Sequence, residues 1–197
     1  MLRNSHLNSI DMKKENLVIL FSGGADSTLL LDIAIRLHYQ PLCILIDYGQ
    51  SHVKELDFAK TTCLRYDVSF QVITLQNLGV NSALTGNHSV QYTGVSEWHV
   101  PSRNLMFVSI AASIAESHGI NLIWYGANYE DREHLFPDCY QEWVFAVNEV
   151  LKRNGSMKIA IEAPLLGMSK NMITQLCSLY KITNDQIFSG YGQQETE

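Results

Sequence analysis

Short apolar runs alternate with longer stretches of helical spacing over most of the chain. A short apolar run bounded by polar residues is typical of a buried strand, and apolar residues at every third or fourth position are typical of a helix. The pattern predicts strands over residues 17–21, 42–47, 70–75, 121–125 and 158–161, and helices over residues 26–38, 51–66, 103–117, 137–152 and 169–180. The helix over 103–117 is apolar on all sides, so we expect it to be buried.

Strands that are apolar throughout and separated by helices are typical of a parallel sheet covered on both faces. We therefore predict a single doubly wound α/β domain over residues 15–192, with a parallel sheet of about five strands and flexible termini over 1–14 and 193–197. Ligands of such folds bind beyond the carboxyl ends of the strands. The long polar segment over 76–99 follows one of these ends, and its length is typical of a lid or a binding loop.

The composition of the chain excludes some classes of protein and disfavours others. The 197 residues are 46% hydrophobic and 17% charged, which excludes a disordered chain. A formal net charge of −6 disfavours nucleic acid as a partner, because binding to nucleic acid depends on phosphate neutralisation by Lys and Arg. No apolar run reaches the roughly 18 residues of a membrane span. The four cysteines form no Cys-x-x-Cys pair, so we expect a cytoplasmic protein with reduced thiols and no membrane partner.

The strongest chemical signal lies between the first predicted strand and the first helix, where residues 21–27 are Phe-Ser-Gly-Gly-Ala-Asp-Ser. Gly23 and Gly24 let the backbone approach an anion, and the helix that follows aims its free N–H groups at that anion. The hydroxyls of Ser22 and Ser27 add donors. The alternative is a glycine-rich turn that serves only chain reversal. Ser-Gly-Gly-x-Asp-Ser is also the signature of PP-loop proteins, and resemblance to them implies that ATP is bound through its pyrophosphate and released as AMP.

Two more segments carry candidate chemistry. Asp47, Tyr48 and Gln50 follow the second strand, which places them near a bound adenosine unless they form an ordinary strand-to-helix turn. Arg103 stands in the first turn of its helix, where a cation opposes the helix dipole and needs a partner. An anionic ligand and a buried carboxylate are the two candidates for that partner, and we favour the ligand.

A fourth segment follows the fourth strand and holds Asn128, Asp131 and the run Phe136-Pro137-Asp138-Cys139. Two carboxylates in a loop at a strand end can hold Mg²⁺ or accept hydrogen bonds from the N–H groups of a heterocycle. Asp138 can instead complement the N-terminus of the helix that follows it. Cys139 is interpreted as a packing residue, since no neighbour that would activate the thiol can be identified.

These four segments together resemble the 7-cyano-7-deazaguanine synthase family of the queuosine pathway, in order and in approximate spacing. The resemblance implies a PP-loop (adenine nucleotide alpha-hydrolase-like) fold, the use of ATP and Mg²⁺, and a deazaguanine substrate with an amine donor; we also expect a homodimer. It implies catalytic roles for Asp26, Arg103 and Lys170, with Asp26 also a candidate magnesium ligand. It implies nucleotide binding by Ser22, Gly23, Gly24, Asp26, Ser27, Asp47, Tyr48 and Gln50, and substrate binding by Arg103, Asn104, Asn128, Asp131, Pro137 and Asp138.

The chain departs from the family on the acceptor side. The family's zinc cysteines lie in Ser-Cys-Tyr and a later Cys-x-x-Cys-x-x-Cys, whereas residues 189–191 are Ser-Gly-Tyr and the printed sequence ends at Glu197, so we expect no zinc. Residues 132–135 replace a Tyr-Ser-Gly segment and are one residue longer, and Tyr140 replaces an Arg.

The resemblance implies adenylation of 7-carboxy-7-deazaguanine and its conversion with ammonia to the 7-cyano compound. The altered acceptor side keeps open a related ligase that couples the activated deazaguanine to another amine, for example on a protein. A non-catalytic nucleotide-binding module is the third alternative.

Overall fold

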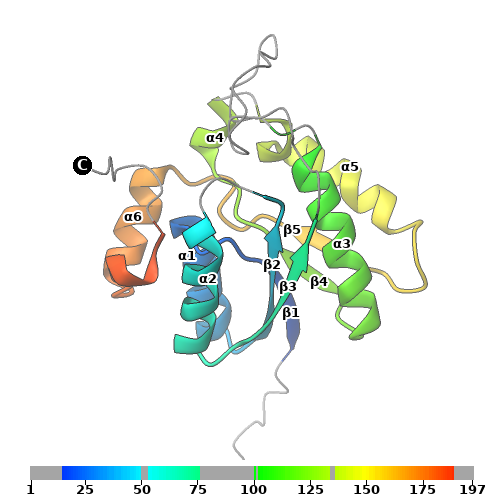
Figure 1. Ribbon diagram of the computed structural model, residues 1–197. Helices are drawn as coiled ribbons and strands as arrows, with labels where there is room; N and C mark the ends of the chain where they lie inside the picture. The colour runs from blue at the N-terminus through cyan, green and yellow to red at the C-terminus, as the bar shows by residue number, and fades with distance from the viewer. Residues whose placement is uncertain (1–14, 50–52, 76–99, 101, 134–135, 189–197) are drawn as a thin grey trace, which may run out of the picture.

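The computed structural model describes residues 15–49, 53–75, 100, 102–133 and 136–188 of the chain (Figure 1). Five parallel strands form one sheet in the order β3-β2-β1-β4-β5. The strands are β1 (Asn16–Leu20), β2 (Gln40–Asp47), β3 (Ser69–Thr74), β4 (Leu122–Trp124) and β5 (Ala160–Glu162). The chain starts in the middle of the sheet and winds outward in both directions, so the predicted doubly wound α/β sheet of five strands is confirmed.

Helices cover both faces of this sheet (Figure 1). The helices are α1 (Ala25–Arg36), α2 (Val53–Arg65), α3 (Arg103–Ser117), α4 (Tyr129–Glu133), α5 (Gln141–Leu151) and α6 (Lys170–Leu179), with short 3₁₀ turns η2 (Pro137–Cys139) and η3 (Asn184–Gln186). Helices α1, α2 and α6 lie on one face, and α3 and α5 lie on the other. Among the described residues, no helix is long and apolar enough to cross a membrane.

The apolar strands fill two cores, one on each face of the sheet. Side chains alternate along a strand, so Val18 packs toward α3 and α5, whereas Leu17 and Ile19 pack toward α1 and α6. All three side chains are 0% exposed. This arrangement explains why β1 is apolar at four consecutive positions, from Leu17 to Leu20, instead of at every second one.

Three sequence-based expectations need correction. Helix α3 has the predicted bounds but is not buried all round, because Leu105 is 42% exposed while the face with Val108 and Ala111 is fully buried. The single helix expected over 137–152 is broken at Tyr140, whose extended backbone (φ −111°, ψ 143°) separates η2 from α5. Helix α4 was expected as a loop, because five residues are too few to show a helical period.

The structure shifts one predicted strand, shows the cap of the last helix and leaves two predictions untested. The last strand was expected over 158–161 and is found at Ala160–Glu162. Ser169 caps α6 as predicted, since its hydroxyl accepts the backbone N–H of Met172 at 3.2 Å. The segment over 76–99 and residues 50–52 lie outside the described residues, so the predicted lid and the cap at Ser51 stay predictions.

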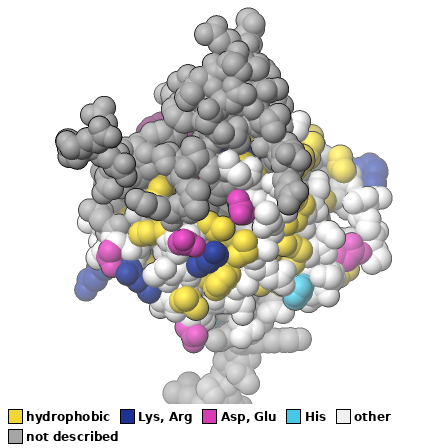
Figure 2. Space-filling model, viewed as in Figure 1, with side chains coloured by type: hydrophobic (Ala, Val, Ile, Leu, Met, Phe, Trp, Pro, Cys, Tyr) yellow, Lys and Arg dark blue, Asp and Glu magenta, His cyan; other side chains and the backbone are white. Residues whose placement is uncertain are grey.

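The face shown in Figure 2 carries hydrophobic side chains across its middle, while charged side chains of both signs are scattered over its described part. On that part of the surface, Lys and Arg do not gather into one patch.

Two leucines test how the cores stabilise the fold. Leu30 of α1 is 0% exposed and Leu64 of α2 is 69% exposed. We expect Leu30→Ala to lower the free energy of unfolding by about 2–5 kcal/mol, because it leaves a cavity in the core. Leu64→Ala makes the same chemical change at the surface and should alter stability by no more than about 0.5 kcal/mol. Urea unfolding measures both, and equal losses would contradict the packing described here.

Candidate active site

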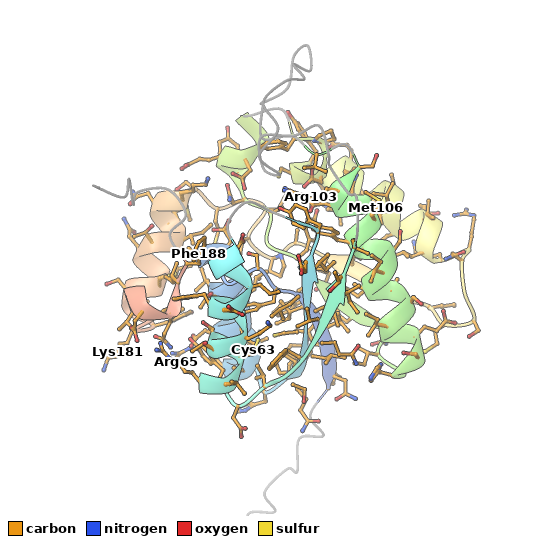
Figure 3. All side chains as sticks on the ribbon, in the orientation of Figure 1. Cys63, Arg65, Arg103, Met106, Lys181 and Phe188 are labelled. Atoms are coloured by element: carbon orange, nitrogen blue, oxygen red, sulfur yellow. The ribbon has the colours of Figure 1, made fainter. Side chains whose placement is uncertain are left out.

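The carboxyl ends of β1, β2 and β4 lie beside one another, because β1 is hydrogen-bonded to both β2 and β4. The segments that follow these strands hold most of the predicted site residues. Figure 3 shows Arg103, at the start of α3, above this edge of the sheet. The strand order therefore brings together residues that are separated by more than a hundred positions in the sequence.

The segment over residues 22–27, named here the SGGADS loop, contains the turn after β1 and the first residues of α1. Gly23 has φ +82°, a left-handed conformation that L side chains rarely adopt. A Cβ atom at this position would lie 3.1 Å from the Cα of Ala59 in α2, so the loop packs directly on that helix. Both properties require glycine at position 23.

Serine hydroxyls hold this loop from within. Ser27 Oγ accepts the N–H of Gly23 at 3.1 Å and lies 3.2 Å from Ser22 Oγ, which accepts the N–H of Gly24 at 3.3 Å. Gly24 is the N-cap of α1 and makes no side-chain capping bond. The first-turn N–H groups of a helix have no partner within the helix, and the helix dipole is positive at this end. The loop therefore has the geometry of an anion-binding site.

A buried amide joins the SGGADS loop to the end of β4. Asn128 is 0% exposed, and its Nδ2 donates to Asp26 Oδ2 at 2.8 Å and to Asp131 Oδ2 at 2.8 Å. The Oδ1 of Asn128 accepts the backbone N–H of Asp131 at 3.0 Å. Lys170 of α6 completes the group, with its Nζ 3.0 Å from Asp131 Oδ1. Four predicted site residues from α1, α4, α6 and the end of β4 thus form one hydrogen-bonded cluster.

The carboxyl group of Asp26 is not an ordinary surface acid. Burial raises the pKa of Asp26 above its usual value, the hydrogen bond from Asn128 lowers it in part, and the nearby charge of Asp131 raises it again. Asp26 therefore lies in the partly buried first turn of α1.

Two carboxylates this close favour a cation between or beside them. Mg²⁺ is usually held by one or two carboxylates together with substrate phosphates, and Asp26 and Asp131 fit that requirement. Within the described residues, no group of three His, Cys, Asp or Glu side chains is able to hold a metal ion without such help. The predicted absence of zinc concerns residues 189–197, which lie outside the described part of the chain.

A second group of predicted residues meets at the start of α3. The guanidinium of Arg103 donates to Tyr48 Oη at 3.2 Å and lies 5.8 Å from the centre of the Tyr48 ring. An aromatic side chain from the end of β2 therefore supports this cation. The anionic ligand that the sequence favours as its partner stays a prediction. A predicted nucleotide-binding residue and a predicted substrate-binding residue are thereby in contact.

The next residue of α3, Asn104, contacts Asp138, a predicted substrate-binding residue. Asn104 Nδ2 donates to the Asp138 carboxylate, and Tyr125 Oη donates to the backbone carbonyl of Asp138 at 2.7 Å. Asp138 lies inside η2, which begins at Pro137. Burial raises the pKa of the Cys139 thiol to about 12, so the nucleophilic thiolate is scarce, as expected for a packing residue.

Two positions near the site were given no role from the sequence. Gly126 has no side chain, and a Cβ atom there would lie 3.3 Å from the Cβ of Asp26, so glycine lets the end of β4 approach α1 closely. Tyr125 fixes η2 through its hydroxyl. The local sequence gives no signal for either contact. Of the predicted nucleotide-binding residues, Asp47 accepts the N–H of Gly49 at 3.2 Å, and Gln50 lies outside the described residues.

The raised pKa of Asp26 makes a prediction for stability. An acid whose pKa is higher in the folded state destabilises the fold when it is ionised, and this cost disappears as the pH falls below the unfolded value of 3.8. We therefore expect Asp26→Asn to increase the free energy of unfolding at pH 7, with the gain shrinking toward pH 4. Denaturant unfolding at several pH values measures the difference. A gain that grows toward acid pH would contradict the prediction.

The sequence of this chain is similar to those of known proteins. The family described as Queuosine biosynthesis protein QueC matches residues 16–197. A protein of Pseudoalteromonas atlantica named 7-cyano-7-deazaguanine synthase is 31% identical over 166 residues, which cover 79% of this chain and 75% of that protein. A protein of Marinomonas sp. with the same name is 33% identical over 167 residues, covering 81% of this chain and 76% of that protein.

A solved structure shares the fold. The U34-tRNA thiolase NcsA from Methanococcus maripaludis superposes with a TM-score of 0.59 at 13% identity, and the match covers 91% of this chain and 60% of that chain. This likeness supports the PP-loop fold alone. The family match over residues 16–197 is the evidence for membership, and the SGGADS loop and the residues around Asp138 lie within it. The chain belongs to the family of the Queuosine biosynthesis protein QueC.

Proposed function

We propose that this chain is an ATP-dependent C–N ligase that adenylates 7-carboxy-7-deazaguanine and converts it with ammonia to 7-cyano-7-deazaguanine. The observation that carries the proposal is the SGGADS loop at the N-terminus of α1, in a chain whose residues 16–197 match the QueC family. Similar proteins named 7-cyano-7-deazaguanine synthase support the choice of substrate.

The first chemical step would form an acyl adenylate. A carboxylate oxygen of the substrate attacks the α-phosphorus of ATP, the bond to the bridging oxygen breaks, and pyrophosphate leaves with that electron pair. The N–H groups at the start of α1 and the hydroxyl of Ser22 would donate to the charge that develops on the leaving group. Ser27, whose hydroxyl bonds Gly23 and Gly24, would hold the loop in shape beside that charge. Asp26 and Asp131 would hold Mg²⁺, which supplies neutralisation of phosphate charge when it is bound.

Residues of α3 and η2 would hold the deazaguanine. Arg103, whose charge is supported by the Tyr48 ring, provides a donor for the substrate carboxylate. The Asp138 carboxylate, positioned by Asn104, provides an acceptor for the N–H groups of the heterocycle. Lys170 beside Asp131 adds a cation on the phosphate side.

The second stage would replace oxygen by nitrogen. Ammonia attacks the acyl carbon and displaces AMP, which gives an amide and releases one proton. The amide oxygen then attacks the α-phosphorus of a second ATP and releases pyrophosphate. Loss of the two amide protons and of AMP, which carries the oxygen away, yields the nitrile. Closure of the segment over 76–99 would keep water from the adenylate.

The proposal also covers the extent of the catalytic domain, its oligomeric state and its location in the cell. We place the catalytic domain at residues 15–192 and propose a homodimer that works in the cytoplasm. All four cysteines are free and buried, which accords with reduced thiols. A deazaguanine and ammonia would be the reactants, with no nucleic acid involved.

The products of ATP cleavage test the proposal. With 7-carboxy-7-deazaguanine, ATP, Mg²⁺ and ammonium present, we expect AMP and pyrophosphate to form in proportion to the nitrile, measured by mass spectrometry. ADP and phosphate as the main products would contradict the PP-loop chemistry. Pyrophosphate release that leaves the nitrile unformed would favour a ligase with a different amine acceptor, and no substrate-dependent release at all would favour the non-catalytic module.

Arg103 provides a test that separates the two substrates. We expect Arg103→Met to raise the KM for the carboxylate about 10- to 100-fold, the cost of losing one hydrogen bond between charged groups, and to change the KM for ATP by less than about 3-fold. Arg153→Met is the matched control, because Arg153 is 72% exposed and pairs with Glu149 near the end of α5. An equal rise in both KM values would contradict the assigned role.

A further inference from the structure

The chain segment after α6 returns to the SGGADS loop. This segment, residues 183–188, is named here the C-terminal strap. At its end, the backbone N–H of Phe188 donates to the carbonyl oxygen of Gly23 at 2.9 Å. The Phe188 ring lies 6.0 Å from that of Phe58 in α2, and Figure 3 shows Phe188 beside α2. The strap therefore contacts the backbone of the loop that is proposed to bind pyrophosphate.

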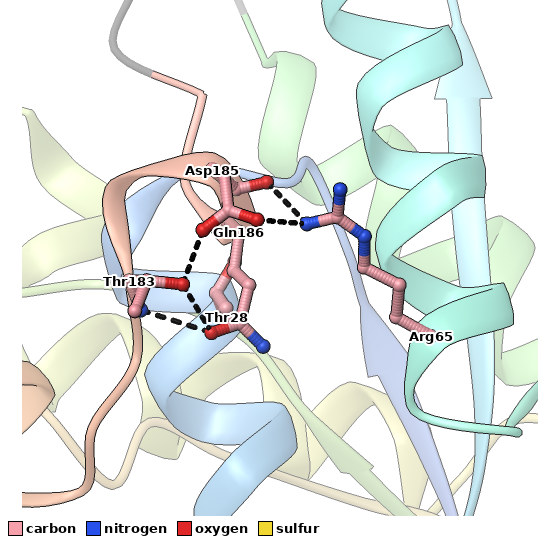
Figure 4. Close-up of polar contacts among 5 residues, drawn as sticks. All are labelled: Thr28, Arg65, Thr183, Asp185 and Gln186. Carbon is pink, nitrogen blue, oxygen red and sulfur yellow. Dashed lines mark hydrogen bonds and ion pairs between the residues drawn. The ribbon is translucent and has the colours of Figure 1, made fainter.

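Helix α2 holds the middle of the strap (Figure 4). Arg65 Nη1 donates to the backbone carbonyl of Asp185 at 2.6 Å and to its carboxylate at 2.8 Å. Within the strap, the Gln186 side-chain oxygen accepts from the backbone N–H of Thr183 at 2.9 Å. Helix α1 contributes a longer contact, from Thr28 Oγ1 to the Gln186 carbonyl at 3.4 Å. A cation, a carboxylate and backbone groups thus fix the strap before it reaches Gly23.

The carbonyl of Gly23 accepts the N–H of Phe188 at 2.9 Å and, in a longer contact, the hydroxyl of Thr28 at 3.4 Å, and these bonds fix the direction of the next N–H group. In a trans peptide the C=O bond and the N–H bond point to opposite sides, and the described residues contain no cis peptide. Holding the carbonyl of Gly23 toward Phe188 therefore aims the N–H of Gly24 away from the strap. That N–H lies 3.3 Å from Ser22 Oγ, on the phosphate side of the loop. A peptide between two glycines has few steric barriers to rotation, so an external hydrogen bond has a large effect on its orientation.

We infer that the C-terminal strap is a positioning element for the terminal phosphates of ATP, with Arg65, Asp185 and the N–H of Phe188 as its positioning groups. The inference rests on the proposed use of ATP and adds a requirement to it. Because the strap fixes one peptide of the SGGADS loop, it acts on ligands that carry the β- and γ-phosphates. AMP lacks both phosphates, and its binding is independent of the strap.

Proline at position 188 tests the hydrogen bond directly, because proline has no backbone N–H. In the full chain, we expect Phe188→Pro to weaken pyrophosphate binding about tenfold, as for the loss of one well-placed hydrogen bond. The matched variant Phe188→Ala removes the ring but keeps the N–H group, and should weaken pyrophosphate binding less than about 3-fold. Affinity for AMP should stay within about 2-fold in both, by isothermal titration calorimetry with Mg²⁺.

A second pair of variants tests the anchor. We expect Arg65→Gln to weaken pyrophosphate binding about 3- to 10-fold with AMP binding unchanged. Lys60→Gln is the control, because Lys60 lies on the same helix and pairs only locally with Asp57 at 3.1 Å. If circular dichroism shows that Phe188→Pro does not fold, Arg65→Gln decides the question.

The outcomes separate this inference from the proposed function. An unaltered chain that binds neither ATP nor pyrophosphate contradicts the proposed function and the inference with it. An unaltered chain that binds both, with variants that bind pyrophosphate equally well, contradicts the inference alone. Equal losses of pyrophosphate and AMP affinity in Arg65→Gln assign the strap to general stability and also overturn it.

Discussion

The buried side chain of Asn128 holds the carboxylates of Asp26 and Asp131 close together, although both groups carry negative charge when ionised. Its single amide group donates one N–H to Asp26 and the other to Asp131, and its carbonyl oxygen accepts from the backbone of Asp131. Carboxylates in such a position repel each other, and burial disfavours their charged forms. The amide and the nearby Lys170 offset part of this cost. The start of α1, the end of β4, α4 and α6 meet in this one hydrogen-bonded arrangement.

The fold was predictable in those segments where burial on both faces of the sheet restricts the residue types. Both faces of the sheet are covered, so Leu17, Val18 and Ile19 are all apolar, and the same constraint explains the apolar run of β2. Helix α3 begins and ends where its period indicates. The order of the strands was not predictable in this way, because pairing depends on contacts between segments distant in sequence. Short elements such as α4 and the break at Tyr140 carry too little pattern to be recognised.

The sequence proposes the residues of the candidate site but does not predict the contacts between them. The SGGADS loop is identified by its local sequence, since the positive φ of Gly23 and the helix start require particular residue types. The partner of Arg103 shows the limit of such reasoning. The helix dipole demands a compensating group, and the sequence offered only anions for that role. The structure places the neutral ring of Tyr48 there, because β2 ends beside the start of α3.

The first turn of α3 joins the two halves of the site. Arg103 contacts Tyr48 on the side proposed for the nucleotide, and Asn104 contacts Asp138 on the side proposed for the deazaguanine. Consecutive Cα atoms are about 3.8 Å apart, and a helix allows them little relative movement. The two contacts therefore cannot shift independently, and a displacement of η2 is transmitted to the ring beside the proposed ATP site. Because carboxylate activation requires both substrates in one geometry, a rigid joint of this kind favours adenylation over separate binding of the two ligands.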